Sequence, residues 1–107
     1  MTKSDIVTNI SEKTGIPKVD ILVTLETFFR EVKFALVDGE PVYVRGFGSF
    51  VLKKRAAKLG RHIKKNEILE IPEHYFPTFR PSKEFVQAVK DQKIDPNEQF
   101  IYEDDDA

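Results

Sequence analysis

PVYVRGFGSFVLKKRAAKLGRHIKK, residues 41–65, is the stretch of sequence that decides the fold. Two β-rich segments, 41–45 and 49–52, flank Gly46-Phe47-Gly48, which is typical of a turn. Beyond Leu52 the alternation of apolar and polar residues fails, because cations would lie on both faces of the strand. Neither face is apolar enough to be buried. We therefore predict a strand that leaves the body of the protein as an exposed arm.

The arm needs a return strand, and the residues that follow supply one. Lys64-Lys65-Asn66 suits a turn, and Ile68-Leu69-Glu70-Ile71 is β-rich. Pro72 and Pro77 restrict the return strand to edge or bulge positions, because proline has no N–H for the ladder. The sequence therefore predicts a two-stranded antiparallel ribbon over about residues 53–76.

Helices flank these strands. Ser4 is a candidate N-cap and Gly15 a candidate C-cap, which together predict a helix over 4–14. Pro17 suits the first turn of a second helix. This helix is predicted over 18–37, where the apolar residues recur with helical spacing: Ile21, Leu25, Phe28, Phe29, Val32 and Leu36. Ser82 is a candidate cap for a short third helix with Phe85, Val86 and Val89 on its inner side.

The composition is that of one soluble globular domain. The chain has 107 residues, of which 40% are hydrophobic and 33% charged. Its apolar runs are too short to span a bilayer, and its first residues do not resemble a secretory signal. The absence of cysteine excludes disulfides and thiolate metal sites. We expect a cytoplasmic protein with no membrane partner.

Charge is strongly segregated along the chain. The formal net charge is −1, yet residues 45–83 carry +7 and residues 91–107 carry −6. Seven cations fall within residues 53–65 with no acid between them: Lys53, Lys54, Arg55, Lys58, Arg61, Lys64 and Lys65. Charged edges discourage strand aggregation, so a merely solvated ribbon is the alternative reading. This density exceeds what edge protection needs, and it predicts contact with DNA phosphates.

The hydrophobic content predicts a dimer. Without arm and tail, about seventy residues remain, which is a marginal size for an independent core. The chain nevertheless contains nine phenylalanines. These could in principle stack on unpaired bases, but their helical or strand spacing favours core packing. We expect Phe47, Phe50 and Phe79 to form a core shared with a second copy, because an isolated ribbon is also unstable by itself.

Two blocks carry a family resemblance. Arg45-Gly46-Phe47-Gly48-Ser49-Phe50 and Lys54-Arg55-Ala56-Ala57-Lys58-Leu59-Gly60-Arg61 closely resemble the bacterial HU/integration host factor family. The match continues at Ile71-Pro72 and at Pro77-Thr78-Phe79-Arg80-Pro81-Ser82-Lys83. The similarity covers about residues 1–90, which we take as the DNA-binding domain, and 91–107 is then an acidic C-terminal tail. The resemblance implies an α+β fold: an intertwined dimer with a helical base, a small antiparallel sheet and two protruding β-ribbon arms that embrace DNA in the minor groove.

The sequence departs from the family at the arm tip. Family members commonly carry a proline there and wedge it between base pairs, whereas this chain has Ile63. An isoleucine can also unstack a base step, although it lacks the rigidity of proline. The alternative is an incidental exposed apolar residue. The acidic tail is a second departure, and our hypothesis is that it competes weakly with DNA for the arms.

Three further cations extend the predicted interface. The resemblance suggests that Arg45 enters the minor groove from the base of the arm, and pairing with an acid of the body is the alternative. Arg80 and Lys83 lie beside the start of the third helix, which favours phosphate. Salt bridges within the body are the alternative for both residues.

No catalytic or metal site is predicted. With a hairpin turning near Lys64-Lys65, His62 would lie opposite Ile68 and His74 opposite Ala56, so the histidines cannot meet. No cysteine or acidic cluster completes a site. We expect neither an enzyme nor a cofactor or small-molecule substrate.

The predicted function is that of a histone-like architectural protein. It would bind and bend duplex DNA with low sequence specificity, contribute to DNA compaction and associate with the nucleoid. We expect a homodimer, with a heterodimer with a paralogue as an alternative. Two other functions remain open: a sequence-selective bender of the integration host factor type, and a protein-interaction or scaffolding module that uses the acidic tail.

Overall fold

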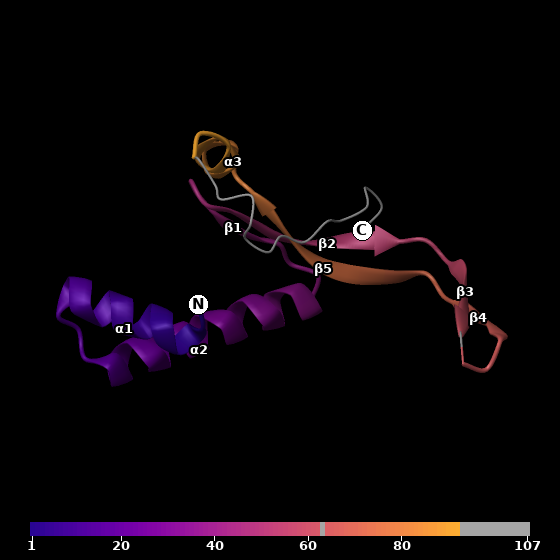
Figure 1. Cartoon of the computed structure of the whole chain (residues 1–107), viewed down its shortest axis with the longest axis horizontal. Helices are drawn as coiled ribbons and strands as arrows, with labels where there is room; N and C mark the ends of the chain where they lie inside the picture. Colours follow the sequence, from indigo (N-terminus) through magenta and orange to yellow (C-terminus); the bar gives the residue numbers. More distant parts are fainter. Residues whose placement is uncertain (63, 93–107) are drawn as a thin grey trace.

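The computed structural model describes residues 1–62 and 64–92, which form three helices and five strands. Helices α1 (Lys3–Thr14) and α2 (Lys18–Val37) form a helical hairpin, from which α2 leads to the strands (Figure 1). The strands are β1 (Val42–Val44), β2 (Gly48–Arg55), β3 (Lys58–His62), β4 (Glu67–Ile71) and β5 (His74–Pro81), and α3 (Lys83–Lys90) follows them. Helices and antiparallel strands are segregated, which confirms the predicted α+β class.

Helix α1 begins one residue before the predicted start, because Thr2 and not Ser4 is its N-cap. The Asp5 N–H donates to the Thr2 hydroxyl oxygen at 3.3 Å, and the Thr2 N–H donates to an Asp5 carboxylate oxygen at 2.8 Å. This reciprocal pair is a capping box, which satisfies two otherwise unpaired backbone donors. The other end is as predicted: Gly15 has φ +76° and donates its N–H to Ser11 O at 2.8 Å.

The cap makes part of the folding stability depend on pH. Donation from the Thr2 backbone N–H, and then from its hydroxyl, holds the pKa of Asp5 below its ordinary value of 3.8. A carboxyl whose folded pKa is depressed stabilises the fold above its unfolded pKa, and this contribution disappears as the pH falls through the folded pKa. Asp5→Asn should therefore lower the free energy of unfolding at neutral pH and have a smaller effect in acid. Urea unfolding at fixed protein concentration, near pH 7 and pH 3, measures the difference. An equal loss at both pH values would contradict it.

Helix α2 has the predicted bounds, 18–37. Pro17 precedes it and its carbonyl accepts from the N–H groups of Asp20 and Ile21. Ile21 on α2 and Val7 on α1 are the two buried hydrophobic residues within the described ranges. Lys3 and Glu26, both about half exposed, bridge the two helices at 3.0 Å. In the described residues no helix combines the length and apolar composition needed to cross a membrane.

Strands β1, β2 and β5 form an antiparallel sheet in that order. The turn between β1 and β2 covers residues 45–47, one residue before the predicted Gly46-Phe47-Gly48. Gly46 has φ +81°, which favours glycine, and the Phe47 N–H donates to Val44 O at 3.0 Å. Strand β5 is an edge strand, so Pro77 costs no ladder bond, as predicted.

The arm consists of two ribbons rather than one. Strand β2 pairs with β5 as far as Arg55↔His74, and β3 pairs with β4 from Lys58↔Ile71 to His62↔Glu67. Between the ribbons, 56–57 and 72–73 lie outside the strands. The residue numbers of paired residues have the same sum in both ribbons, as in Arg55↔His74 and Lys58↔Ile71. The strands therefore keep one register across the break. The outer ribbon leaves the sheet at an angle in Figure 1, whereas the sequence had suggested one continuous ribbon.

Phenylalanines gather on one side of the sheet. The Phe79 ring lies 5.1 Å from both Phe47 and Phe50, and Phe85 of α3 lies 5.3 Å from Phe47, between ring centroids. These separations suit favourable aromatic pairs. Phe47 is nevertheless 46% exposed. The cluster therefore has an open side.

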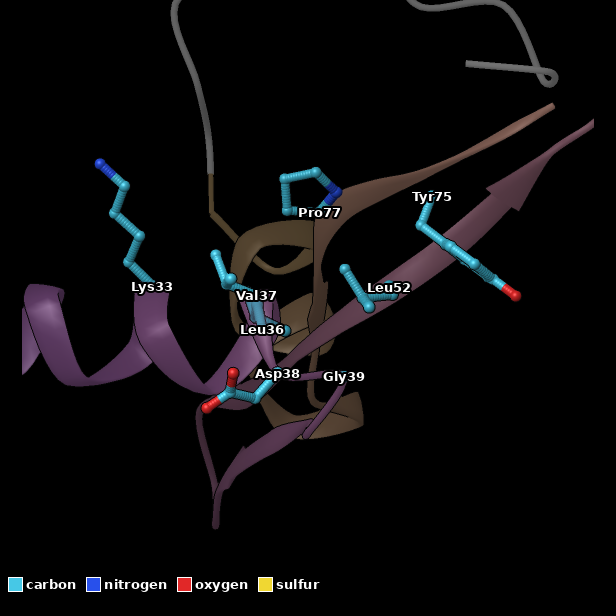
Figure 2. A pocket seen from close by; sticks show the side chains of 8 residues that line it. All are labelled: Lys33, Leu36, Val37, Asp38, Gly39, Leu52, Tyr75 and Pro77. Carbon is cyan, nitrogen blue, oxygen red and sulfur yellow. The ribbon is translucent and has the colours of Figure 1, made fainter. Parts of the chain in front are cut away.

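A second open apolar surface lies between the end of α2 and the sheet. Leu36 and Val37 of α2, Leu52 of β2 and Pro77 of β5 line a groove of about 870 Å³ (Figure 2). Leu52 and Phe50 lie two residues apart on β2, so they share one face of the sheet. The groove therefore continues the face that carries the phenylalanine cluster.

Candidate nucleic-acid interface

The predicted DNA-binding cations fall into two groups. The larger group follows the arm. It comprises Lys53, Lys54 and Arg55 on β2, Lys58 and Arg61 on β3, and Lys64 and Lys65 in the turn to β4. Ile63, the predicted wedge, lies outside the described residues. Arg45, Arg80 and Lys83 form the smaller group, which lies where the β1–β2 turn meets the start of α3.

Ser82 holds the smaller group together. Its hydroxyl accepts from the Phe85 N–H at 3.1 Å, as expected of the predicted N-cap, and donates to Gly46 O at 3.0 Å. The Ser82 N–H donates to Phe47 O at 2.8 Å. These bonds fasten the start of α3 to the turn that carries Arg45. The structure thus brings Arg45 near Lys83, which are far apart in the sequence.

The alternative prediction was that Arg45, Arg80 and Lys83 form salt bridges with acids of the body. The described residues give this alternative no support. Within 1–62 and 64–92, no acidic side chain forms a salt bridge with Arg45, Arg80 or Lys83. All three residues are exposed. Their charges are therefore available to an external anion, at a place where the N-terminus of α3 also favours negative charge.

The register of the arm differs by one residue from the prediction. His62 is opposite Glu67 rather than Ile68, and His74 is opposite Arg55 rather than Ala56. Residues 64–66 form a turn, as predicted, and Asn66 has φ +51°; the pairing is centred between Lys64 and Lys65, whereas the predicted pairing was centred on Lys65. The two histidines remain far apart along the arm, as predicted. Among the described residues no group of three metal-ligating side chains comes together.

At the inner end of the arm, two contacts organise the cations. The Arg55 guanidinium stacks on the Phe76 ring with 4.1 Å between Cζ and the ring centroid. This cation–π contact orients a long, flexible side chain. Lys54 Nζ lies 3.0 Å from Glu73 Oε1 with both side chains more than half exposed, so this ion pair contributes little to stability.

A basic hollow of about 600 Å³ lies at the break between the two ribbons. Its cationic lining comes from Lys53, Lys54, Arg55 and Lys58, and Phe76 contributes an aromatic wall. Four cationic residues around one concave surface produce a local positive potential. Such a surface suits an anion.

Farther out, the arm exposes two apolar side chains that were not among the predicted site residues. Leu59 is 71% exposed and Ile68 is 73% exposed. Leu59 is opposite Glu70 and Arg61 is opposite Ile68, so these four residues share one face of the outer ribbon. Strand alternation alone could not reveal this pair, because it depends on the register between β3 and β4.

Comparisons with known proteins agree with this geometry. The family model described as bacterial DNA-binding protein matches residues 1–90. The chain is 36% identical to DNA-binding protein HU of Thermotoga maritima over 90 residues, which cover 84% of this chain and 100% of the relative. It is also 36% identical to integration host factor subunit alpha of Aliivibrio salmonicida over 95 residues, covering 89% and 97% of the two chains.

Solved structures of HU proteins are also similar to this chain in fold. The fold is similar to that in an Anabaena HU–DNA cocrystal structure, with a TM-score of 0.80 and 33% sequence identity. That match covers 86% of this chain and 100% of the Anabaena chain. HU from Thermotoga maritima gives a TM-score of 0.59 with 27% identity, covering 83% and 98%. Both matches cover more than four fifths of this chain and support the α+β fold.

Proposed function

Because this chain belongs to the bacterial DNA-binding family of HU and integration host factor, we propose that it binds and bends duplex DNA as an architectural, histone-like protein. The observation that carries the proposal is the basic arm. Seven cations lie on a projecting ribbon, and the similar Anabaena protein was solved with DNA. Cations of this kind neutralise phosphates and release counterions, whereas phosphates carry no sequence information. Low sequence specificity follows, and no catalytic activity is proposed.

The proposed interface contains both groups of cations. The arm group closes on the minor groove, and Arg45, Arg80 and Lys83 bind phosphates nearer the body. Ile63 is the proposed wedge at the tip. Leu59 and Ile68 would contact the apolar sugar walls of the groove, because exposed apolar side chains among cations suit a surface that is apolar between phosphates.

A dimer is the proposed binding unit. The open side of the phenylalanine cluster and the groove beside Leu52 form a continuous apolar surface that water would otherwise cover. A second copy would bury Phe47, Phe50 and Phe79 and would present two arms to one duplex. Residues 1–90 would form this DNA-binding domain, and 91–107 its acidic tail. We place such a dimer at the nucleoid in the cytoplasm.

Anisotropy titrations test the function. Labelled duplexes of unrelated sequence, intact and nicked, are titrated with protein at several salt concentrations. The proposed function predicts binding to all of them, a steep fall of affinity with salt, and tighter binding to nicked DNA, which is easier to bend. Weak binding even at low salt would overturn it in favour of the scaffolding alternative.

The same titrations, with random DNA as a competitor, distinguish the second candidate. Both HU and integration host factor subunits are among the similar proteins. A sequence-selective bender of the integration host factor type would resist competition by random duplexes, because base contacts and sequence-dependent deformation contribute to its affinity. Equal competition by all sequences would leave the low-specificity function.

Removal of the acidic tail should tighten DNA binding at low salt. The tail carries −6 and the 45–83 segment +7, so the tail would compete with phosphates for the arms. The tail beyond Gln92 lies outside the described residues. Anisotropy titrations compare the DNA affinity of a chain truncated after Lys90 with that of the full chain. The gain in affinity should vanish at high salt, because salt screens the charges. Unchanged affinity at low salt would contradict the competition.

A further inference from the structure

The basic hollow at the break in the arm also has an apolar part. Phe76, Ile71, Ala56 and Ala57 line it together with the four cationic residues, and Phe76 is 42% exposed. An anion alone would leave this apolar surface in contact with water, which is unfavourable. The hollow therefore suits a ligand that carries apolar and anionic groups side by side.

Arg55 has an unsatisfied donor in this hollow. Its Nε is buried and has no hydrogen-bond partner among the residues that the structure describes. The guanidinium is stacked on the Phe76 ring, with 4.1 Å between Cζ and the ring centroid. Buried polar groups are nearly always hydrogen-bonded, so this donor indicates an acceptor from outside the described residues. A carboxylate is well suited, because it accepts charge-assisted hydrogen bonds from a guanidinium.

The hollow lies mainly on the face of the sheet that the proposed dimer leaves open. Lys53 pairs with Phe76 and Arg55 with His74, so these four residues share one face of the inner ribbon. Leu52, which lines the groove proposed to contact a second copy, precedes Lys53 and lies on the opposite face. A second copy on the groove would therefore not cover this side of the arm.

A segment of this chain outside the described residues has a composition complementary to the hollow. Phe100-Ile101-Tyr102 is followed directly by Glu103-Asp104-Asp105-Asp106. Two aromatic rings and an isoleucine thus stand beside four carboxylates, as the aromatic wall of the hollow stands beside its cations. We call residues 100–106 the aromatic–acidic segment. Its charges attract the arm, and its rings offer apolar area to bury.

The aromatic–acidic segment can reach the hollow. Phe76 precedes Ser82 by six residues, so the hollow is about 20 Å along β5 from the start of α3. Helix α3 is about 12 Å long, and Figure 1 views it nearly end-on, so it runs across β5. The end of α3 is then about 23 Å from the hollow, whereas the chain from Gln92 to Phe100 extends up to about 28 Å. Because β5 is an edge strand, the chain can pass around it.

We propose that the aromatic–acidic segment docks in the basic hollow and inhibits DNA binding by the same protein. Phe100 and Tyr102 pack against Phe76 and its apolar neighbours, and a carboxylate from the acidic run accepts from Arg55. The docked segment occupies cations of the proposed DNA interface, so DNA has to displace it. The proposal rests on the proposed DNA-binding function, and it differs from competition by charge alone because apolar side chains fix the segment at one place.

Phe100→Ser/Tyr102→Ser tests the apolar contact, since it keeps every charge of the tail. Duplex affinity of the full-length variant is measured by anisotropy at low salt. We expect binding about threefold to tenfold tighter than that of the unaltered protein, because the docked state loses its buried rings. Ile94→Ser is the control: it replaces another apolar residue of the tail, outside the aromatic–acidic segment. Its effect should be less than half as large.

A spin label tests the docking directly and without DNA. The chain has no cysteine, so Ala107→Cys gives one site for a nitroxide close to the aromatic–acidic segment. Amide resonances of the full-length protein are then compared with the label oxidised and reduced. We expect selective broadening around the hollow, at 53–58 and 71–76, and little in α1. The same label in the Phe100→Ser/Tyr102→Ser variant should broaden these amides much less.

The outcomes separate the docking from the proposed function. If the unaltered protein fails to bind duplex DNA, the proposed function is wrong, and the spin label still shows whether the segment docks. Truncation after Lys90 that tightens DNA binding, with no effect of Phe100→Ser/Tyr102→Ser, would leave competition by charge alone and overturn the docking. Broadening spread evenly over all basic surfaces, or confined to the groove between α2 and the sheet, would also overturn it.

Discussion

A Lys58→Ala/Arg61→Ala variant should bind duplex DNA at least about a hundredfold more weakly than the unaltered protein at low salt. Hydrogen bonds to charged groups typically contribute about 1.5–3 kcal/mol, and the variant removes two cations from each arm. The reduction should be nearly equal on unrelated sequences, because phosphate contacts carry no base information. The salt slope should become shallower by roughly 0.9 for each phosphate that the variant no longer neutralises. Anisotropy titrations over a range of salt measure both quantities.

A variant with the same charge change elsewhere controls for net charge. Lys13→Ala/Arg30→Ala removes two exposed cations from the helices α1 and α2, and should weaken binding only slightly. A comparable reduction in this control would show that overall charge, and not the arm, determines affinity. A reduction confined to one DNA sequence would indicate direct base readout by Lys58 or Arg61.

Gly48→Ala should destabilise the fold by about 2–3 kcal/mol, which is the upper part of the range for overpacked interiors. A Cβ at Gly48 would lie 2.6 Å from Phe79 Cζ and 2.7 Å from Cε1, and it would also press on Arg80 O. The ring belongs to the aromatic cluster and the carbonyl to the backbone of β5, so neither can easily move. The melting temperature should fall by roughly 10–20 °C. Thermal unfolding followed by circular dichroism measures it at fixed protein concentration.

Gly60→Ala is the matched control, since Gly60 also lies in a strand and has no positive φ. Its Cβ would approach only Ile71 Cδ1 closely, at 3.0 Å, and that atom is the flexible end of a side chain. We expect a change within about 0.5 kcal/mol. Similar destabilisation of both variants would show that the close contacts of a Cβ at Gly48 do not explain the stability lost in Gly48→Ala.

Local signals predicted the helices accurately. The bounds of α2, the Gly15 C-cap and the Ser82 N-cap are confirmed, because each depends on residues within a few positions of one another. The N-cap of α1 was wrong for a similarly local reason. Thr2 and Ser4 are both suitable caps, and the choice was decided by Asp5, which lies three residues after Thr2 and completes the capping box.

The exposed arm was predictable from the sequence, but its internal geometry was not. Composition predicted an exposed basic ribbon, and the structure places these cations on one. The break at 56–57 and 72–73 was not predicted, because it depends on contacts between strands that alternation in one strand does not report. The Arg55–Phe76 stacking and the Lys54–Glu73 ion pair depend on the same unpredicted cross-strand geometry.

The phenylalanine cluster was predicted in part. The rings of Phe47, Phe50 and Phe79 meet, as the patterns suggested. The contact of Phe85 with this cluster was not predicted. It depends on the position of α3, which Ser82 fixes through a hydrogen bond to Gly46 in the β1–β2 turn, far away in the sequence. The predicted sharing of this cluster with a second copy stays a prediction.

The constant register across the two ribbons constrains how the arm can change in evolution. A single-residue insertion in β3 alone would turn every side chain beyond it to the opposite face, and Arg61 would exchange sides with its neighbours. An insertion matched by one in β4 would preserve the pairing, and a matched pair in each strand would also preserve the orientation of the tip. Natural or engineered arms of a different reach should therefore differ by two residues in each strand, added or removed together. Among related proteins, the length of the arm should therefore change in steps of two residues per strand.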